Sequence, residues 1–350
     1  MAGLSYIEIR GTPFDAGRAL GEFGAAALHD YARRSAVWAR AMRLRGSVLA
    51  ASMAHQVRTR FPRVWEELQG MAVGIGLPFD DLFLWNCRGD LWAMAPDGCT
   101  TVQQAGEVRR ITHNEDGDPA FAGHCAIAAC AVAGAVPFAA FVYPGSIAGH
   151  TFAVTDGGLA MTVNSLRCRA VQPGVPRMVL ARALLEVAGL DEALALVRGT
   201  ERAGSFHLTL AHRNEHALLS VEFSAQACAV ETVCASSRRA LHTNHALHLP
   251  LRALPQTITP SSRYRQQRGT ALLAGDSGLD ALQVLADTGD ARFPILRTAS
   301  LNSGAESTLA TADIRIHTGC IEWQVYEHPA RPPCFHMRGA RAAHRGLGLA

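Results

Sequence analysis

The spacing of apolar residues changes once along the chain, close to Gly98 and Cys99. Before this pair, apolar residues recur at three- and four-residue steps, the spacing of amphipathic helices, and Thr12 with Pro13 forms a good helix start. After it, short alternating segments typical of strands recur between helical stretches. Because the sequence has neither internal repeats nor regular strand–helix–strand alternation, we expect a layered α+β domain.

The same patterns give approximate bounds for the elements. Helices are predicted at residues 12–31, 48–71 and 177–198, near residue 78, and as a pair within 262–287. Strands are predicted as hairpins at 102–116 and 151–166, and singly at 206–211, 218–223, 227–234, 309–316 and 320–326. Helical and strand-rich regions therefore follow one another twice along the chain.

All 33 basic residues are Arg, because the sequence contains no Lys. This excludes mechanisms that need a lysine amine, such as a pyridoxal Schiff base, a P-loop lysine or a Ser–Lys hydrolase pair. The net charge is only +3 and no basic run exceeds two residues, so neither nucleic acid nor an anionic membrane is an expected partner. Any chemistry must come from Cys, Ser, Thr, His, Asp, Glu or Arg.

The nine Cys residues are scattered without a CxxC pair, which favours reduced thiols and a cytoplasmic location over a disulfide framework. The first residues carry charge early and lack an apolar stretch, so no secretory signal is expected. Residues 125–143 carry no charge and are long enough to test as a membrane span. Gly134 and Pro137 interrupt this stretch, and we interpret it as strands buried on both faces.

Gly98 and Cys99 also form a junction suited to self-cleavage. Gly98 leaves its carbonyl open to the Cys99 sulfur, and a cut at this bond would leave a thiol and an α-amine on one residue. An α-amine has a pKa of about 7.7–8.0, so it can serve as a general base near neutral pH. On its own the motif is weak, because a Cys at a strand start is more often a small buried hydrophobic residue.

Further motifs give this junction a context. They lie at residues 97–101, 112–116, 158–166, 243–245, 293–297 and 307–311. Their order and spacing resemble the acyl-coenzyme A:6-aminopenicillanate acyltransferase family. These proteins are N-terminal-nucleophile (Ntn) hydrolases related to the choloylglycine (bile-salt) and penicillin V hydrolases. The resemblance covers most of the chain and implies an α+β fold, the four-layer αββα sandwich of Ntn hydrolases.

The resemblance also implies a processed chain. Residues 1–98 would form a helical α-chain that is retained after autocleavage between Gly98 and Cys99. Residues 99–350 would form a β-chain that begins with the Cys99 nucleophile. The two chains together would make one composite domain.

Three further catalytic residues follow from the resemblance. Asp116 matches the family's aspartate that assists the cysteine, where it would accept hydrogen bonds from the Cys99 ammonium. Asn244 matches the asparagine whose amide helps stabilise the oxyanion. Arg297 matches an arginine near the nucleophile, where its cation would favour the thiolate.

Three other positions are expected to bind substrate. Thr155 stands where relatives carry an Asn, so a hydroxyl or a backbone N–H would have to replace a second oxyanion donor. Asn164 matches a family position to which we give a structural or pocket-lining role. His113, where several relatives have Gln or Arg, either contacts substrate or is a satisfied strand histidine.

The implied reaction is attack of Cys99 on the carbonyl of a small linear amide, followed by release of the acyl group to water. Acyl transfer to an amine is the first alternative, and an uncleaved, non-catalytic binding protein of the same fold is the second. Neither a cofactor nor a metal is expected, and a homo-oligomer is compatible with the sequence.

Two other candidate sites compete with this one. His242, His245 and His248 are spaced by three, which on a helix could gather ligands for zinc, but Pro250 and the turn at 243–244 disfavour a helix. A papain-type Cys–His pair would need a nucleophilic helix start, and no local motif marks one.

Overall fold

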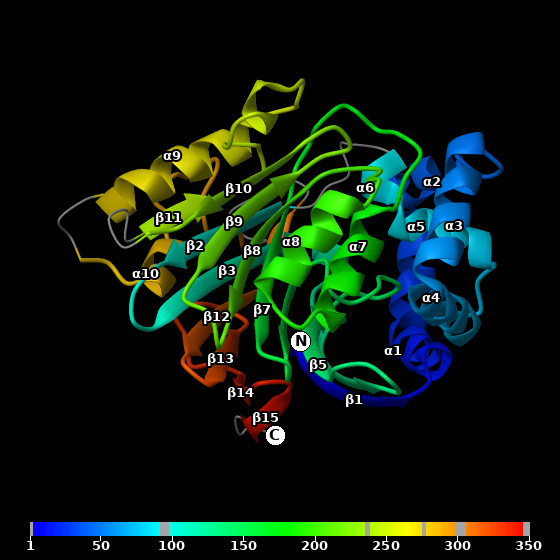
Figure 1. Cartoon of the computed structure of the whole chain (residues 1–350), viewed down its shortest axis with the longest axis horizontal. Helices are drawn as coiled ribbons and strands as arrows, with labels where there is room; N and C mark the ends of the chain where they lie inside the picture. Colours follow the sequence, from blue (N-terminus) through cyan, green and yellow to red (C-terminus); the bar gives the residue numbers. More distant parts are fainter. Residues whose placement is uncertain (1–2, 92–97, 235–238, 275–277, 299–305, 346–350) are drawn as a thin grey trace.

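Two β-sheets pack face to face between helical layers in the computed structural model, which describes residues 3–91, 98–234, 239–274, 278–298 and 306–345 (Figure 1). The eight-stranded sheet has the order β1-β4-β5-β6-β7-β8-β9-β10, and the seven-stranded sheet has the order β11-β2-β3-β12-β13-β14-β15. Helices α1, α4 and α7 lie on the side of the first sheet, and α9 and α10 pack on the second. The expected four-layer αββα fold is therefore confirmed.

The bounds of the elements are as follows. The eight-stranded sheet contains β1 (Ser5–Gly11), β4 (Ala126–Val132), β5 (Phe138–Val142), β6 (Phe152–Thr155), β7 (Leu159–Ser165), β8 (Phe206–His212), β9 (Leu218–Phe223) and β10 (Cys228–Thr232). The seven-stranded sheet contains β11 (Arg239–His242), β2 (Gly98–Gln104), β3 (Arg109–Gly117), β12 (Ser307–His317), β13 (Cys320–Tyr326), β14 (Phe335–Arg338) and β15 (Arg341–Arg345). The helices are α1 (Pro13–Arg34), α2 (Ala36–Met42), α3 (Val48–Arg60), α4 (Pro62–Ile75), α5 (Phe79–Asn86), α6 (Arg88–Leu91), α7 (Arg177–Ala183), α8 (Leu190–Gly199), α9 (Pro260–Ala274) and α10 (Ala281–Leu285).

The first helix begins where its sequence predicts. Thr12 Oγ1 accepts from the backbone N–H of Asp15, and the Asp15 carboxylate accepts from the backbone N–H of Thr12, with Pro13 in the first helical turn. This capping box satisfies N–H groups that have no partner within the helix. The start of α1 is thus encoded locally.

Two helix predictions are wrong in the same way, because each expected helix is interrupted. The predicted helix at 48–71 divides into α3 and α4 at Pro62, which has no N–H to donate to the preceding turn. The predicted helix at 177–198 divides into α7 and α8, with Gly189 extended just before α8. Apolar spacing continued across both interruptions, so periodicity alone did not reveal them.

The N-terminal segment contributes a strand as well as helices. β1, which was not predicted, pairs in parallel with β4, so that Ser5 lies opposite Ala126 and Gly11 opposite Val132. A strand from residues 1–98 therefore completes one edge of a sheet built otherwise from residues after 98.

The uncharged stretch at 125–143 forms β4 and β5, which pair antiparallel in the eight-stranded sheet. Its interpretation as buried strands is confirmed. Within the described ranges, no helix combines the length and the apolar character needed to cross a bilayer.

Candidate active site

Cys99 is the second residue of β2, and only 2% of it is exposed. The antiparallel pairing of β2 with β3 places Cys99 opposite Glu115 and Gly98 opposite Asp116. Because side chains alternate along a strand, Cys99 and Glu115 share one face of this hairpin, whereas Gly98 and Asp116 share the other. The face of β2 that carries the Cys99 side chain therefore has different neighbours from the face on which Gly98 lies. Asp97, the preceding residue of the motif, lies outside the described residues.

The face that carries the Cys99 sulfur is lined by a carboxylate. Cys99 Sγ donates to Oε2 of Glu115 at 3.6 Å, and the same oxygen lies 3.1 Å from Nε2 of His113. The hydroxyl of Tyr143 donates to Oε1 of Glu115 at 2.9 Å. Burial lowers the pKa of His113 to about 3, so its ring is neutral at physiological pH. The Cys99 thiol thus lies beside a carboxylate and a neutral imidazole.

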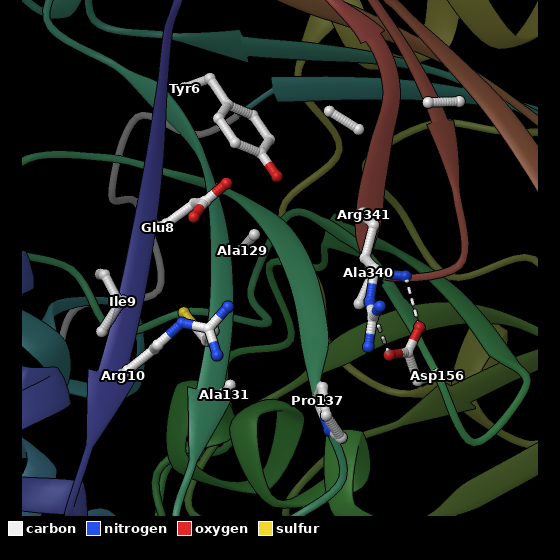
Figure 2. A pocket seen from close by; sticks show the side chains of 13 residues that line it. Tyr6, Glu8, Ile9, Arg10, Ala129, Ala131, Pro137, Asp156, Ala340 and Arg341 are labelled. Atoms are coloured by element: carbon white, nitrogen blue, oxygen red, sulfur yellow. Dashed lines mark hydrogen bonds and ion pairs between the residues drawn. The ribbon is translucent and has the colours of Figure 1, made fainter.

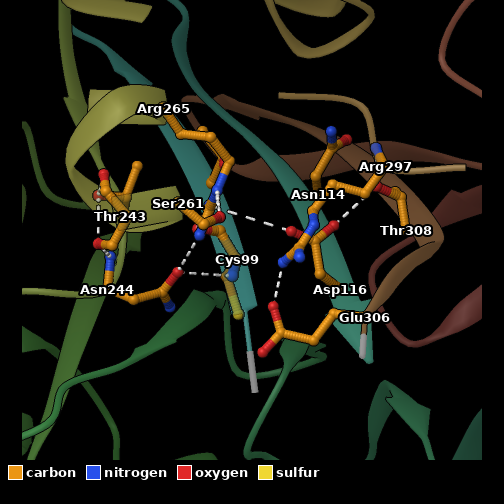
Figure 3. Close-up of polar contacts among 12 residues, drawn as sticks. Cys99, Asn114, Asp116, Thr243, Asn244, Ser261, Arg265, Arg297, Glu306 and Thr308 are labelled. Atoms are coloured by element: carbon orange, nitrogen blue, oxygen red, sulfur yellow. Dashed lines mark hydrogen bonds and ion pairs between the residues drawn. The ribbon is translucent and has the colours of Figure 1, made fainter. Parts of the chain in front are cut away.

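The backbone of Cys99 is held by Asn244 and Arg265 (Figure 3). Its N–H donates to Oδ1 of Asn244 at 3.1 Å, and its carbonyl accepts from Nη1 of Arg265 at 2.6 Å. Arg265 also donates to Oδ1 of Asn244 at 2.6 Å and to Thr100 Oγ1 at 2.7 Å. Arg265, on α9, therefore connects the Cys99 carbonyl, the Thr100 hydroxyl and the Asn244 side-chain oxygen, and these contacts hold the start of β2 in place.

Asp116 lies on the face of Gly98, where it is completely buried. Thr308 Oγ1 donates to Oδ1 of Asp116 at 2.7 Å, and Nη1 of Arg265 lies 3.9 Å from Oδ2. Oδ2 has no hydrogen-bond partner among the described residues. Burial raises the pKa of Asp116, and the nearby cations of Arg265 and Arg297 oppose that rise.

Arg297 reaches the same junction from the segment before β12 (Figure 3). It forms an ion pair with Glu306, whose other oxygen lies 3.7 Å from Nη2 of Arg167. A Cβ on Gly98 would lie 2.7 Å from Oε2 of Glu306 and 3.2 Å from Nη1 of Arg297. Any side chain at position 98 would therefore displace the groups that surround the Gly98–Cys99 peptide bond.

The four residues expected to be catalytic thus converge: Cys99, Asp116, Asn244 and Arg297 all surround the Gly98–Cys99 bond. Their individual roles stay predictions. The orientation of Asn244 adds one detail, because its oxygen rather than its amide nitrogen faces the backbone N–H of Cys99. The amide nitrogen donates to the carbonyl of Ser165 at 3.2 Å.

The residues expected to bind substrate are distributed differently. His113 and Asn164 join a buried polar network between the sheets, where Thr101 Oγ1 donates to Oδ1 of Asn164 at 2.7 Å and lies 2.8 Å from Nδ1 of His113. Asn164 also donates to the carbonyl of His242 at 3.2 Å. These bonds fit the structural alternatives given for both residues.

Thr155 is not brought to the nucleophile. Its Oγ1 accepts from the N–H of Leu159 at the first end of β7, whereas Ser165, at the last end, is the residue that contacts Asn244. Six residues at about 3.3 Å each place the two ends roughly 20 Å apart. This position does not fit the expectation that Thr155 replaces an oxyanion donor beside Cys99.

Sequence reasoning missed Arg265, Glu115 and Glu306. The position of Glu115 could have been predicted. If the strands of the predicted hairpin are paired residue by residue, Glu115 lies opposite Cys99 on the same face. Arg265 and Glu306 carried no such signal, because their contacts depend on how α9 and the segment before β12 pack.

Two clusters of described residues could hold a metal ion. One comprises His207, His242 and His248, and the other comprises Cys99, His113 and Glu115. The competing trio of His242, His245 and His248 does not come together in the structure, because Nδ1 of His245 lies 2.8 Å from the Ser262 hydroxyl and His207 takes its place in the cluster.

A surface hollow of about 660 Å³ lies elsewhere, between β1 and the β14–β15 turn (Figure 2). Its charged lining includes Glu8, Arg10 and an ion pair in which Arg341 lies 3.9 Å from Asp156. None of the residues around Cys99 described above lines it, so this hollow is separate from the candidate active site.

Comparisons with known proteins found the following similarities. The model of the family described as acyl-coenzyme A:6-aminopenicillanic acid acyl-transferase matches residues 102–329. A Drosophila melanogaster protein, the beta-alanyl-dopamine/carcinine hydrolase, is 24% identical over 163 residues, which cover 41% of this chain and 42% of that protein. The chain thus spans less than half of that relative's length. The crystal structure of a variant of conjugated bile acid hydrolase from Clostridium perfringens is similar with a TM-score of 0.43 and 11% identity, covering 65% of this chain and 89% of that chain.

Proposed function

The chain belongs to the acyl-coenzyme A:6-aminopenicillanic acid acyl-transferase family, and from this premise we propose that it is an autoprocessed N-terminal-cysteine amidohydrolase. It cuts itself between Gly98 and Cys99 and then cleaves a linear amide of a small molecule through an acyl-enzyme on Cys99. The single observation that carries the proposal is the set of side-chain contacts around the Gly98–Cys99 bond. Asn244 and Arg265 hold the N–H and the carbonyl of Cys99, and the Cys99 thiol lies beside Glu115.

Self-cleavage begins when the Cys99 thiol loses its proton and the sulfur attacks the carbonyl carbon of Gly98. Collapse of the tetrahedral intermediate breaks the C–N bond, the Cys99 nitrogen takes up a proton, and the Gly98 acyl group remains on sulfur as a thioester. Water then hydrolyses this thioester. The products are a carboxylate on Gly98 and a Cys99 that carries both a free thiol and an α-amine.

In the mature enzyme the new α-amine serves as the base. With an ordinary pKa of about 7.7–8.0, it accepts the thiol proton as the sulfur attacks the substrate carbonyl, and that proton leaves with the departing amine. Asn244 Oδ1 already accepts from this nitrogen before cleavage, which supports a role in orienting the amine afterwards. Water resolves the acyl-enzyme and regenerates the thiol.

The buried charges behind the junction support the same cycle. Asp116 provides a carboxylate on the face of Gly98, and Arg265 and Arg297 provide the cations that favour its ionised form. An ionised carboxylate there would attract the α-ammonium formed by cleavage. Cys99 forms no disulfide with the other described cysteines, which also suits the reducing cytoplasm that we expect as the location.

Acyl transfer is the second candidate function, favoured by the name of the matching family. Transfer and hydrolysis share the acyl-enzyme and differ in whether an amine or water attacks it. An N-acyl amide can be supplied with and without 6-aminopenicillanic acid as acceptor, and the products separated by mass. Hydrolysis predicts the free acid in both samples, whereas transfer predicts a new amide that appears only with the acceptor.

The decisive test is the state of the purified protein. We expect two fragments, residues 1–98 and 99–350, with Cys99 as the first residue of the larger one, and a single band for Cys99→Ala. The fragments should stay together during gel filtration and separate only in denaturant, because β1 pairs with β4 across the cut.

Cys130→Ala is the matched control, since Cys130 is equally buried but lies in β4. It should be processed like the parent. Two fragments in Cys99→Ala would assign the cut to another protease. An uncut parent that binds small amides without turnover would instead support the binding-protein alternative.

A further inference from the structure

Three different atoms that can bind a metal lie close together on one face of the β2–β3 hairpin. They are the sulfur of Cys99, Nε2 of His113 and Oε2 of Glu115. The sulfur of Cys99 and Nε2 of His113 lie 3.6 and 3.1 Å from the same oxygen, Oε2 of Glu115. The three side chains come from paired residues of β2 and β3, and each is at most 4% exposed. A thiolate, an imidazole and a carboxylate are the ligands that zinc binds in proteins.

Two of the three separations between the donor atoms match those within a tetrahedral zinc site, and all three atoms lie within 4.8 Å of one another. Bonds of about 2.3 Å to sulfur and about 2.0–2.1 Å to nitrogen and oxygen, at tetrahedral angles, place sulfur and oxygen roughly 3.5 Å apart and nitrogen and oxygen roughly 3.3 Å apart. The observed 3.6 and 3.1 Å differ from these values by only a few tenths of an ångström. Small side-chain movements would therefore complete the site.

The hydrogen bonds around His113 define which ring nitrogen carries its hydrogen. Asn164 donates through Nδ2 to the carbonyl of His242, so its Oδ1 faces Thr101 and takes the only hydroxyl hydrogen of that residue. Thr101 must then accept from Nδ1 of His113, 2.8 Å away. In the neutral ring, Nε2 is left with a lone pair, and that lone pair is directed at Glu115.

Two electron-rich atoms, Nε2 of His113 and Oε2 of Glu115, therefore face each other at 3.1 Å. A metal ion between these two atoms can accept a lone pair from each. The bond from His113 to Thr101 also has the form of the outer-shell contact that orients histidine ligands of metals.

We propose that Cys99, His113 and Glu115 form a three-ligand site for a thiophilic divalent cation such as Zn²⁺, and that its occupation blocks the nucleophile. Binding replaces the thiol proton of Cys99, which leaves to solvent, so the sulfur binds as a thiolate. A sulfur bonded to zinc is not free to attack a carbonyl. Zinc would therefore stop self-cleavage of the uncut chain and turnover by the mature enzyme.

The inhibitory consequence rests on the proposed function, but the metal site does not. Binding can be measured separately with Co²⁺, which gives a thiolate-to-cobalt charge-transfer band and stands in for zinc. We expect one cobalt per chain with this band, and competition by Zn²⁺. The band should be lost in Cys99→Ser, whatever the enzymatic activity of the protein.

The other ligands are tested by zinc affinity, measured against a coloured chelator. Glu115→Gln and Thr101→Val should each weaken binding at least about tenfold, because loss of an outer-shell partner alone costs about 10–100-fold. Thr101→Ser keeps the hydroxyl and should bind like the parent. Circular dichroism of each variant separates loss of the site from loss of the fold.

His248→Gln is the matched control, because it removes a ligand of the second cluster. It should leave zinc affinity unchanged. A loss in His248→Gln without a loss in Glu115→Gln would place the metal at the histidine cluster and overturn the proposal. So would a cobalt complex without a thiolate band, or one whose band persists in Cys99→Ser.

Activity then tests the consequence. If the protein is an amidase, its activity should fall in proportion to zinc occupancy and return when EDTA is added. Full turnover with the site occupied would overturn the inhibitory role while leaving the proposed function intact. Absence of amidase activity in the metal-free protein would count against the proposed function and not against the zinc site.

Discussion

Asn244 contacts the backbone of Cys99 through its side-chain oxygen, and Arg265 determines this orientation. Arg265 can only donate hydrogen bonds, so the atom of Asn244 that it contacts at 2.6 Å must be Oδ1. The amide nitrogen then donates one hydrogen to Ser165 and has a second hydrogen for another acceptor. Asn244 can thus hold the Cys99 nitrogen with one atom and an oxyanion with the other.

We predict that Asn244→Ala lowers kcat by about 10²–10³ and changes KM little, because an oxyanion donor acts mainly in the transition state. Self-cleavage passes through a similar oxyanion, so the two fragments should be co-expressed, the larger starting at Cys99. Steady-state kinetics of this pre-cut enzyme give the answer. Asn214→Ala, at an exposed turn position, is the control. Turnover of pre-cut Asn244→Ala at the parent rate would limit Asn244 to a structural role.

At the scale of elements, α1 and α4 approach so closely that only glycine, which has no side chain, fits at their contact. A Cβ on Gly17 would lie 1.8 Å from the backbone oxygen of Glu67, and one on Gly70 would lie 1.9 Å from that of Phe14. Backbone atoms cannot rotate away as the end of a side chain can. The spacing of these two helices therefore depends on the absence of side chains.

Gly70→Ala should destabilise the protein by about 1–3 kcal/mol or more, because the added methyl overpacks the contact between α1 and α4. Thermal unfolding in the Cys99→Ala background keeps a single chain and avoids differences in processing. Gly199→Ala is the matched control, since a Cβ there meets no atom within 4 Å. Equal melting temperatures for Gly70→Ala and Gly199→Ala would show that α1 and α4 can move apart without loss of stability.

At the scale of the whole molecule, burial keeps several histidines neutral. It lowers the pKa of His113 and His150 to about 3 and that of His245 to about 4. In the unfolded chain a histidine takes up a proton below about 6.5. Acid therefore stabilises the unfolded state, and each of these groups lowers stability as pH falls from 6.5 towards its folded value. Asp90 acts in the opposite direction below about 6, because burial raises its pKa to about 6.

His150→Gln should remove one such contribution. Between pH 6 and 4, the free energy of unfolding of the parent should fall with decreasing pH by about 1.4 kcal/mol per pH unit more than that of the variant. Urea unfolding at several pH values, again in the Cys99→Ala background, measures the difference. His55→Gln, at an exposed position of α3, should keep the slope of the parent. Parallel curves for the parent and His150→Gln would show that His150 is protonated in the folded protein.

Local signals in the sequence determined a large part of this protein. The capping residues predict the start of α1, alternation predicts the hairpin of β2 and β3, and the missing charges at 125–143 predict buried strands. The junction at Gly98 and Cys99 was equally visible. These features depend on neighbours within a few residues, so the sequence order itself carries them.

Tertiary structure decided what depends on distant partners. β1 becomes a strand by pairing with β4, more than 100 residues later, and Arg265 reaches Cys99 only because α9 packs on the seven-stranded sheet. The alternation of side chains along a strand predicts that Glu115 shares a face with Cys99. It does not predict which other residues surround these two side chains. The position of Thr155, on β6 beside the first end of β7, was also hidden, because motif order does not report distance along a strand. Contacts between layers come from packing, and no local periodicity encodes which layer faces a given side chain.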